Sequence, residues 1–214
     1  SLVLETPAHA AVSTAVALVE QFRETANYAG LVNAVARKIS SMGPQALAKL
    51  PERIDTPGWM WRSWERVYGA DTTRAIAKAH TKEAPIYLTP RDPADAALLA
   101  ADTGGVLLPT GSVRVPAGTK VATLPGFDDG RFWVQDAAAA IPARLLGDIR
   151  GKRVFDLCAA PGGKTMQLAA AGAEVIAVDE SGDRLKRVGE NLARTKLNAL
   201  TVKADVASWE PASP

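Results

Sequence analysis

The sequence has one cysteine, two histidines and no long hydrophobic run, and each shortage excludes a class of protein. A single cysteine cannot form an internal disulfide framework and is typical of a reducing compartment. His9 and His80 have no other histidine or cysteine at metal-ligand spacing, so no metal site is expected. No apolar run approaches the length of a membrane span, and the first residues lack the features of a signal peptide. We therefore predict a soluble, cytoplasmic protein without a membrane partner.

The sequence also lacks a large excess of charge of either sign. Lys and Arg together number 25 and Asp and Glu 23, which gives a net charge of +2. This slight basic excess is compatible with a nucleic-acid partner but does not indicate one. A chain of 214 residues, 47% of them hydrophobic, can form one large globular domain or two modest ones. The oligomeric state has no sequence signal of its own, and we predict a monomer.

Residues 1–83 are predicted to form a helical region. Between residues 8 and 40, apolar side chains recur at three- and four-residue spacing, which gives each helix one apolar face. These side chains are Val12, Val16, Val19 and Phe22, followed after Gly30 by Leu31, Val35 and Ile39.

A second helical pair is predicted within the same region. Thr56 is expected to cap a helix with Pro57 at its first position, and Gly69 to end it. Asp71 is expected to cap a further helix that runs to about His80. The first of these helices carries an aromatic stripe, Trp61, Trp64 and Tyr68. Such a stripe could stack on bases, but a place in the core is favoured by roughly four to one.

Residues 84–140 are predicted to form a small α/β module of the βαβ type. Glycine and proline separate short apolar runs, which is the pattern of strands joined by tight turns. The expected strands are 86–88, 106–108 and 132–134, and the expected helices are 92–101 and about 135–146. The residues of this stretch do not by themselves reveal a function.

Residues 141–214 alternate regularly between strand and helix patterns. The expected strands are 153–157, 174–178 and 200–203, and the expected helices are 164–171 and 183–196. This alternation predicts right-handed βαβ units and a parallel sheet. We expect the first half of a Rossmann-like, doubly wound sheet, with its remaining strands in sequence beyond Pro214. Residues 141–214 alone should be unstable, because the last strand would leave an unpaired edge and half a core.

A glycine turn after the first of these strands is the main candidate for a ligand site. Ligands of parallel sheets bind beyond the carboxyl ends of the strands, and adjacent glycines permit close approach of the backbone. Gly163-Lys164-Thr165 ends like a phosphate-binding P-loop, but that pattern requires glycine where Cys158 stands. The Gly-x-Gly-x-x-Gly spacing of dinucleotide sites is also missing.

A smaller adenosine ligand, S-adenosylmethionine, fits the pattern better, because it carries no phosphate. Asp179 ends the second strand, about where an acid that binds a ribose belongs. Asp205 follows the third strand and could accept a hydrogen bond from an adenine amino group. Either aspartate alone could equally be an ordinary turn residue at a strand end. Three successive strand ends that carry Gly-Gly, Asp and Asp make the stronger signal.

The stretch Asp156-Leu157-Cys158-Ala159-Ala160-Pro161-Gly162-Gly163-Lys164-Thr165 resembles the cofactor motif of the RNA cytosine-5 methyltransferases. Residues 130–136 resemble the segment that leads into the catalytic domain of this family. Pro57-Gly58-Trp59, with residues 64–69, is similar to a helical stretch of its ribosomal RNA branch, RsmB/Sun. Residues 31–37 look like the last helix of the NusB-type RNA-binding domain that precedes it.

The resemblance implies a class I methyltransferase that transfers a methyl group to carbon 5 of a cytosine in small-subunit ribosomal RNA. The implied cofactor is S-adenosylmethionine, and the helical region and the small module would hold RNA. The residues that the resemblance assigns to the cofactor are Cys158, Ala159, Ala160, Pro161, Gly162, Gly163, Lys164, Asp179 and Asp205. Lys164 could approach the cofactor's carboxylate or only complement the loop and project to solvent.

No catalytic residue is predicted in this chain. Carbon 5 of cytosine becomes nucleophilic only after a cysteine thiolate adds to carbon 6. The family carries its cysteines for this step in two later motifs, which this sequence does not contain. Cys158 lies in the cofactor loop, where we expect a small buried thiol rather than a nucleophile.

Two classes of function therefore stay open. The first is the RNA-binding and cofactor-binding part of a methyltransferase. The second is a non-catalytic RNA-binding or assembly module that retains the fold. A methyltransferase for a protein or a small molecule would fit the sheet but not the helices before it.

Overall fold

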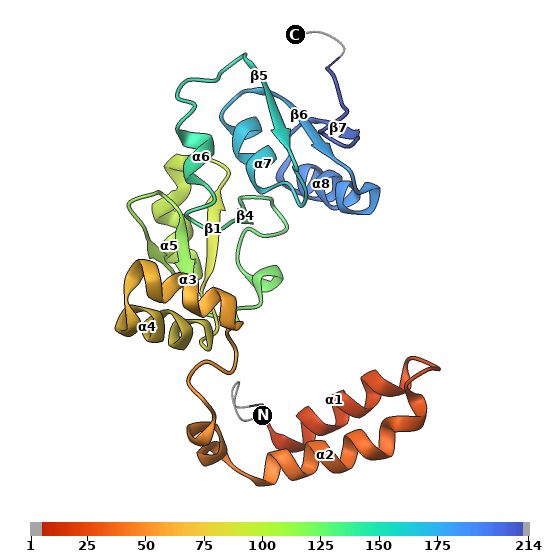
Figure 1. The fold of residues 1–214 in the computed structure, drawn as a ribbon. Helices are drawn as coiled ribbons and strands as arrows, with labels where there is room; N and C mark the ends of the chain where they lie inside the picture. Colours follow the sequence, from red (N-terminus) through yellow and green to blue (C-terminus); the bar gives the residue numbers. More distant parts are fainter. Residues whose placement is uncertain (1–5, 212–214) are drawn as a thin grey trace. The chain divides into compact units, whose positions relative to one another are not determined.

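The computed structural model describes residues 6–211 (Figure 1). The chain folds into two compact units, one up to Glu83 and the other from Ala84 onward. The first unit is helical, and the second contains two β-sheets.

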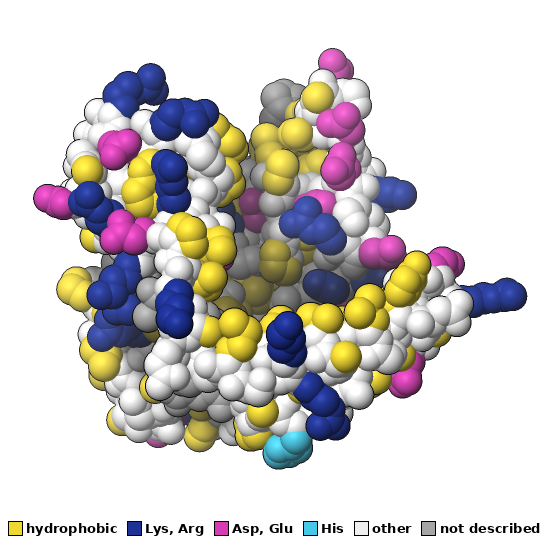
Figure 2. Space-filling view, turned by 60° about the horizontal axis from the view of Figure 1, so that its bottom comes forward, with side chains coloured by type: hydrophobic (Ala, Val, Ile, Leu, Met, Phe, Trp, Pro, Cys, Tyr) yellow, Lys and Arg dark blue, Asp and Glu magenta, His cyan; other side chains and the backbone are white. Residues whose placement is uncertain are grey.

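The first unit begins with a helical hairpin. Helices α1 (Ala8–Glu20) and α2 (Ala29–Ser41) pack side by side and are joined through the short helix η1 (Ala26–Tyr28). The helices expected between residues 8 and 40 are thus confirmed. Their apolar faces are buried only in part: Val12 is buried, whereas the larger side chains stay exposed. These are Leu18, Phe22, Leu31, Val35, Ile39 and Met42. Figure 2 shows apolar side chains along this hairpin on the face turned to the viewer.

The short helix η2 (Pro44–Lys49) leads to α3 (Gly58–Tyr68) and α4 (Ala70–His80). Gly69 separates the last two with a φ of 78°, as expected for a residue that ends a helix. The expected Thr56 cap is wrong: Pro57 occupies the cap position, and Thr56 is buried without capping the helix. Asp71 lies in the first turn of α4 rather than at its cap.

The aromatic stripe of α3 divides between core and surface. Trp61 is buried, and the ring of Trp64 contacts that of His80 edge-on at 5.5 Å between centroids. Tyr68 is 56% exposed. The core role is therefore confirmed for Trp61 and fails for Tyr68.

The second unit opens with a four-stranded antiparallel sheet in the order β2-β3-β1-β4. Its strands are β1 (Ile86–Pro90), β2 (Val106–Leu107), β3 (Val113–Val115) and β4 (Phe132–Val134). Three helical segments connect them: η3 (Pro93–Asp95), α5 (Ala96–Thr103) and η4 (Val121–Thr123). Leu88, Leu99, Val113, Val115 and Phe132 form the core between this sheet and α5.

The predicted βαβ topology of this module is wrong. Strand β3, which the sequence reading missed, lies between β1 and β2, and all pairings are antiparallel. The physical reason is a turn in which Gly111 donates to the Leu108 carbonyl and Leu108 to the Ser112 carbonyl. This turn folds β2 back onto β3 as a hairpin, so β2 cannot pair with β1.

The helix expected from 135 to 146 shortens to α6 (Ile141–Arg144). Asp136 accepts hydrogen bonds from the amides of Ala138 and Ala139, which favours turns before the helix begins. The side chain of Gln135 is held between those of Trp133 and Gln167.

The parallel sheet has the order β5-β6-β7, as the alternating pattern predicted. Its elements are β5 (Arg153–Leu157), α7 (Gly163–Ala170), β6 (Glu174–Asp179), α8 (Gly182–Thr195) and β7 (Leu200–Lys203). Helices α7 and α8 pack against each other and against the sheet (Figure 1). Strand β6 is central and largely buried, whereas β5 is an edge strand within residues 6–211, and its Leu157 is 48% exposed. The strand that leads into the glycine turn is therefore only partly buried.

The two sheets share a core within the second unit. Trp133 of β4 is buried against Met166 of α7 and Val188 of α8. Arg194 of α8 donates to the carbonyls of Phe127 and Phe132, and Arg91 donates to the Thr195 carbonyl. The antiparallel module therefore supports the helices that carry the glycine turn.

Candidate functional site

The glycine turn joins β5 to α7 in a conformation that few residues adopt. Cys158 has a φ of 65° and Gly162 a φ of 105°, and the Ala160–Pro161 peptide bond is cis. A Cβ atom at Gly162 would lie 3.3 Å from Val188, so both the dihedral and the space favour glycine. Cys158 is exposed, which corrects the expectation of a buried thiol. The left-handed backbone at this residue directs the chain away from the strand.

Asp179, at the end of β6, anchors this turn. Its Oδ2 accepts a hydrogen bond from the Ala160 amide at 3.0 Å, and its Oδ1 accepts one from the Ser181 amide at 3.0 Å. The side chain of Asp179 is 2% exposed and lies 3.6 Å from Nη1 of Arg184. Burial raises the pKa of Asp179, but the amides of Ser181 and Ala160 and the Arg184 guanidinium outweigh it and lower that pKa overall. The carboxylate is therefore anionic and fixed in place.

Arg184 and Asn191, on α8, complete the support of the turn. Nη2 of Arg184 donates to the Ala160 carbonyl at 2.6 Å, and Nδ2 of Asn191 donates to the Pro161 carbonyl at 3.1 Å. The turn is thus hydrogen-bonded to β6 on one side and to α8 on the other. The sequence reading missed both residues, because their partners lie far away along the chain.

A second buried carboxyl lies under the turn. Thr165 donates its hydroxyl to Oδ2 of Asp156 at 2.6 Å. Both residues are buried, and desolvation raises the pKa of Asp156 despite the opposing effects of the Thr165 hydroxyl and the nearby Lys164. This pair ties the end of β5 to the first turn of α7. Its only sequence signal was an acidic residue set between the apolar residues Phe155 and Leu157 of the strand.

The remaining residues of the predicted site lie at the same edge of the sheet. Ala159 donates to the Val178 carbonyl, which holds the turn against β6. Asp205 follows β7, and the preceding Ala204 donates to the Asp179 carbonyl at 3.1 Å. The Asp205 carboxylate is exposed and accepts a hydrogen bond from the Ala207 amide. Lys164 is exposed too, and its charge acts on Asp156.

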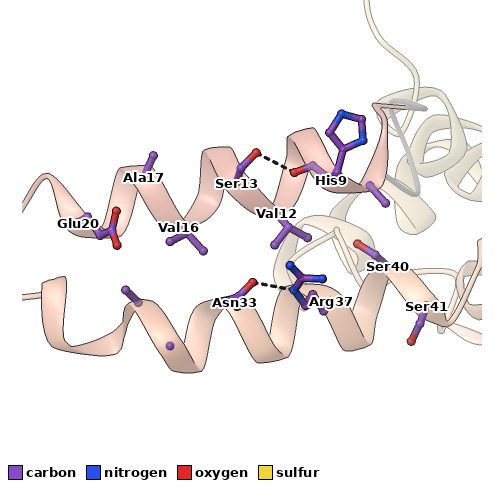
Figure 3. Close-up of a pocket in the computed structure, with 13 residues that line it drawn as sticks. His9, Val12, Ser13, Val16, Ala17, Glu20, Asn33, Arg37, Ser40 and Ser41 are labelled. Atoms are coloured by element: carbon purple, nitrogen blue, oxygen red, sulfur yellow. Dashed lines mark hydrogen bonds between the residues drawn. The ribbon is translucent and has the colours of Figure 1, made fainter.

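A hollow of about 970 Å³ lies elsewhere, along the helical hairpin of the first unit (Figure 3). Figure 3 shows Val12 and Val16 pointing from α1 toward α2, while Arg37 bonds to Asn33 and Ser13 to the His9 carbonyl. These polar groups are satisfied within their own helices, and none of the predicted site residues lines the hollow. The glycine turn is therefore the better candidate site.

Two further observations concern metal ions and membranes. Among residues 6–211, the acidic, histidine and cysteine side chains form no group of three that could hold a metal ion. In the same part of the chain, no helix combines the length and apolarity needed to cross a bilayer.

Comparison with known proteins connects this turn to one family. Residues 143–212 match the family described as 16S rRNA methyltransferase RsmB/F. Ribosomal RNA small subunit methyltransferase B of Pseudomonas putida is 32% identical over 97% of this chain and 51% of its own length. The chain belongs to the RsmB/F family. The protein of the same name from Vibrio cholerae is also 32% identical, over 93% of the chain and 49% of its own length. The chain thus spans about half the length of the curated relatives that it matches.

Solved structures related to the RsmB/F fold agree with this architecture. The crystal structure of PH0851 superposes with a TM-score of 0.69 at 19% identity, over 94% of this chain and 48% of that one. NSun6 from Pyrococcus horikoshii, determined with SFG, gives a TM-score of 0.58 at 15% identity, over 70% of this chain and 65% of that one. At these identities the likeness concerns the fold alone, and it supports the Rossmann-like assignment of the second sheet.

Proposed function

We propose that this chain supplies the RNA-binding and cofactor-binding parts of an S-adenosylmethionine-dependent enzyme that methylates carbon 5 of a cytosine in ribosomal RNA. The observation that carries the proposal is the glycine turn held by Asp179 at the carboxyl end of a parallel sheet. The similarity to ribosomal RNA methyltransferases supplies the reaction class and the substrate class.

The chemistry of the turn fits an adenosine ligand without phosphates. An anionic carboxylate buried directly behind the turn disfavours a phosphate there through like-charge repulsion. Carboxylates accept hydrogen bonds from ribose hydroxyls, and each oxygen of Asp179 has a further lone pair beyond the one used by a backbone amide. Asp205 is exposed beside it, at the position proposed for the adenine amino group.

Under this proposal the residues of the turn bind and orient, and they do not react. The backbone from Cys158 to Lys164 would contact the amino-acid end of S-adenosylmethionine, whose sulfonium supplies an electrophilic methyl group. Lys164 keeps both of its alternative roles, since its exposed side chain permits either. Activation of the cytosine requires a thiolate that adds to carbon 6, and we do not assign that role to Cys158 because it belongs to the cofactor turn.

Calorimetric titration with S-adenosylmethionine tests the cofactor assignment on the chain as it stands. Removal of a carboxylate hydrogen bond should weaken binding about tenfold or more in Asp205→Ala. The control, Asp129→Ala, removes another exposed aspartate, from the turn before β4, and should bind as the unmodified chain does. Absence of binding by a chain that melts cooperatively would refute the cofactor assignment. RNA binding without cofactor binding would instead favour the non-catalytic module.

A further inference from the structure

A small cavity lies in the second unit between the antiparallel sheet and helices α6 and α7. Its volume is about 310 Å³, at the lower end of the range of ligand sites. The side chains with polar atoms that line it belong to Thr89, Arg91, Trp133, Arg144 and Gln167. None of the residues predicted to bind the cofactor lines this cavity.

Buried hydroxyl groups without a partner lie in or next to the cavity wall: Thr89 lines the cavity, and Thr110 and Ser112 flank Gly111, which also lines it. Thr89 is 4% exposed and Ser112 is fully buried, yet neither hydroxyl finds a hydrogen-bond partner among the described residues. The same is true of the Thr110 hydroxyl. Thr89 faces Trp133 across the β1–β4 pairing, which places both on the cavity side of the sheet. The register of Leu88 with Val113 brings Ser112 next to Thr89 on that side.

Buried polar atoms are rarely left unpaired in proteins, so such a cluster calls for an explanation. A hydroxyl both donates and accepts, which makes these groups suited to an oxygen-rich ligand. The cluster is local: Gly111, which lines the cavity, stands between Thr110 and Ser112.

Two arginines add positive charge at the same place. A Cβ atom at Gly111 would lie 3.7 Å from Nη2 of Arg144, so this guanidinium rests over the hydroxyl-bearing turn. Arg91 lines the cavity and commits Nη1 to the Thr195 carbonyl. Neither arginine forms an ion pair within residues 6–211, and no acidic side chain of that range lines the cavity. The electrostatic preference is therefore for an anion.

The other polar groups of the wall are already satisfied and hold it rigid. Nε1 of Trp133 donates to Gln135, Gln135 donates to Gln167, and Gln167 donates to the Ala140 carbonyl. This chain of hydrogen bonds leaves Thr89 and the arginines as the groups free to select a ligand. The rest of the wall is apolar, from Pro90, Pro93, Ala170 and Ala171.

We propose that this cavity binds the phosphate of one nucleotide unit of an RNA strand. The phosphate oxygens accept hydrogen bonds from Arg144 and the Thr89 hydroxyl, and the sugar lies against the apolar wall. The proposal rests on the proposed function for its choice of RNA as the source of the phosphate. The site would position the strand beside the cofactor domain without contacting the methyl donor.

Nuclear magnetic resonance of the 214-residue chain provides the test. The indole N–H of Trp133 reports on the cavity wall, and its resonance is assigned by its loss in Trp133→Phe. The probes are inorganic phosphate, uridine 5′-monophosphate and a single-stranded decauridylate. The decauridylate should shift the Trp133 resonance and bind at least about tenfold more tightly than the mononucleotide, because flanking phosphates add contacts.

Three variants distinguish binding at this cavity from nonspecific electrostatic attraction of RNA to the chain. Arg144→Ala should weaken the binding of decauridylate about tenfold, since a charge-assisted hydrogen bond to phosphate is lost. Thr89→Val removes an unpaired hydroxyl with little change of shape, so it should weaken binding without lowering the melting temperature. Arg187→Ala removes the same charge from an exposed position on α8, outside the helical region and the small module, and should bind as the unmodified chain does.

The outcomes distinguish the sources of the ligand. Equal affinity for the mononucleotide and the decauridylate would overturn RNA as the source, and a Trp133 resonance that stays unmoved at saturation would overturn the site itself. S-adenosylmethionine affinity should be unchanged in Arg144→Ala. Failure of the unmodified chain to bind S-adenosylmethionine would refute the proposed function while leaving the cavity result intact.

Discussion

The Ala160 amide donates a 3.0 Å hydrogen bond to Oδ2 of Asp179, and this bond joins the glycine turn to the end of the neighbouring strand. The same carboxylate accepts a hydrogen bond from the Ser181 amide at the start of α8. A single buried anion therefore fixes both loops that border the proposed cofactor site. Asp179 has a structural role in addition to the proposed contact with ribose.

Asp179→Asn should reduce the free energy of unfolding by about 1–3 kcal/mol, the usual cost of losing charge-assisted hydrogen bonds in a buried site. Asparagine offers one acceptor oxygen, so only one of the two backbone amides keeps its partner. Urea denaturation followed by circular dichroism measures the change. Asp183→Asn, at an exposed ion pair on α8, is the control and should change stability by less than about 1 kcal/mol. Equal stability of the two variants would contradict the anchoring role.

The two buried carboxyls make opposite contributions to the pH dependence of stability. The pKa of Asp179 is lower in the folded chain than in the unfolded chain, so its contribution is present above the ordinary carboxyl pKa of about 3.9. That contribution is lost as pH falls through the folded value. Asp179→Asn should therefore lose less stability than the unmodified chain when pH is lowered from 6 toward 3. If the free energy of unfolding of the two proteins changed equally with pH, the pKa of Asp179 would not be lowered.

The contribution of Asp156 to the pH dependence of stability should have the opposite sign. Burial raises its pKa in the folded chain, so folding favours the protonated form and loses stability as pH rises from the unfolded toward the folded pKa. Asp156→Asn keeps an acceptor for the Thr165 hydroxyl and removes the buried charge. This variant should be at least as stable as the unmodified chain at pH 7, and melting curves at pH 5 and pH 7 measure it. A large loss of stability at pH 7 would show that the charge itself is needed.

Much of the second unit could be predicted from the sequence, for identifiable reasons. Strands β5 and β7 begin and end where expected, and α7 and α8 differ by one residue at each end. These elements have strong periodicity and are separated by glycine or polar turns. Strand β3 was missed because Arg114 interrupts its apolar residues, whereas β2 and β4 are uninterrupted apolar runs. Its place in the sheet depends on pairing with β1, which no local pattern encodes.

The candidate site, too, could be predicted from the sequence only in part. The glycine turn and Asp179 follow from motif and spacing, and the structure places them in contact. Arg184 and Asn191 act through backbone carbonyls of the turn, which are partners that a sequence pattern does not reveal. The burial of Cys158 was inferred from residue type and proved wrong, because its left-handed backbone turns it outward. Backbone geometry, rather than hydrophobicity, decides exposure at this position.

Gly130→Ala should destabilise the chain by about 2–5 kcal/mol, the combined cost of a left-handed alanine and of overpacking. Gly130 has a φ of 66°, and a Cβ atom there would clash with the carbonyl of Arg194 on α8. The contact lies where the antiparallel module meets a helix of the parallel sheet. Thermal denaturation measures the loss.

Gly147→Ala is the matched control for that measurement. Its φ of 69° is nearly the same, but no atom lies within 4 Å of the new Cβ. This variant should therefore lose only the dihedral cost of about 1–2 kcal/mol. An equal loss in the two variants would show that the close approach of Gly130 to α8 contributes nothing.

The exposed thiol of Cys158 should report directly on the occupancy of the glycine turn. As the single cysteine of the chain, it gives one unambiguous signal with a thiol reagent such as Ellman's reagent. The native chain should react at a rate within about tenfold of the urea-unfolded chain, since exposure rather than unfolding controls access. If S-adenosylmethionine binds along the backbone from Cys158 to Lys164, saturating cofactor should slow the reaction of the native chain. The same concentration should leave the unfolded chain unaffected, which controls for an effect on the reagent. Unchanged reactivity under conditions where calorimetry shows cofactor binding would place the cofactor away from Cys158, because a ligand seated against this turn restricts access to its thiol.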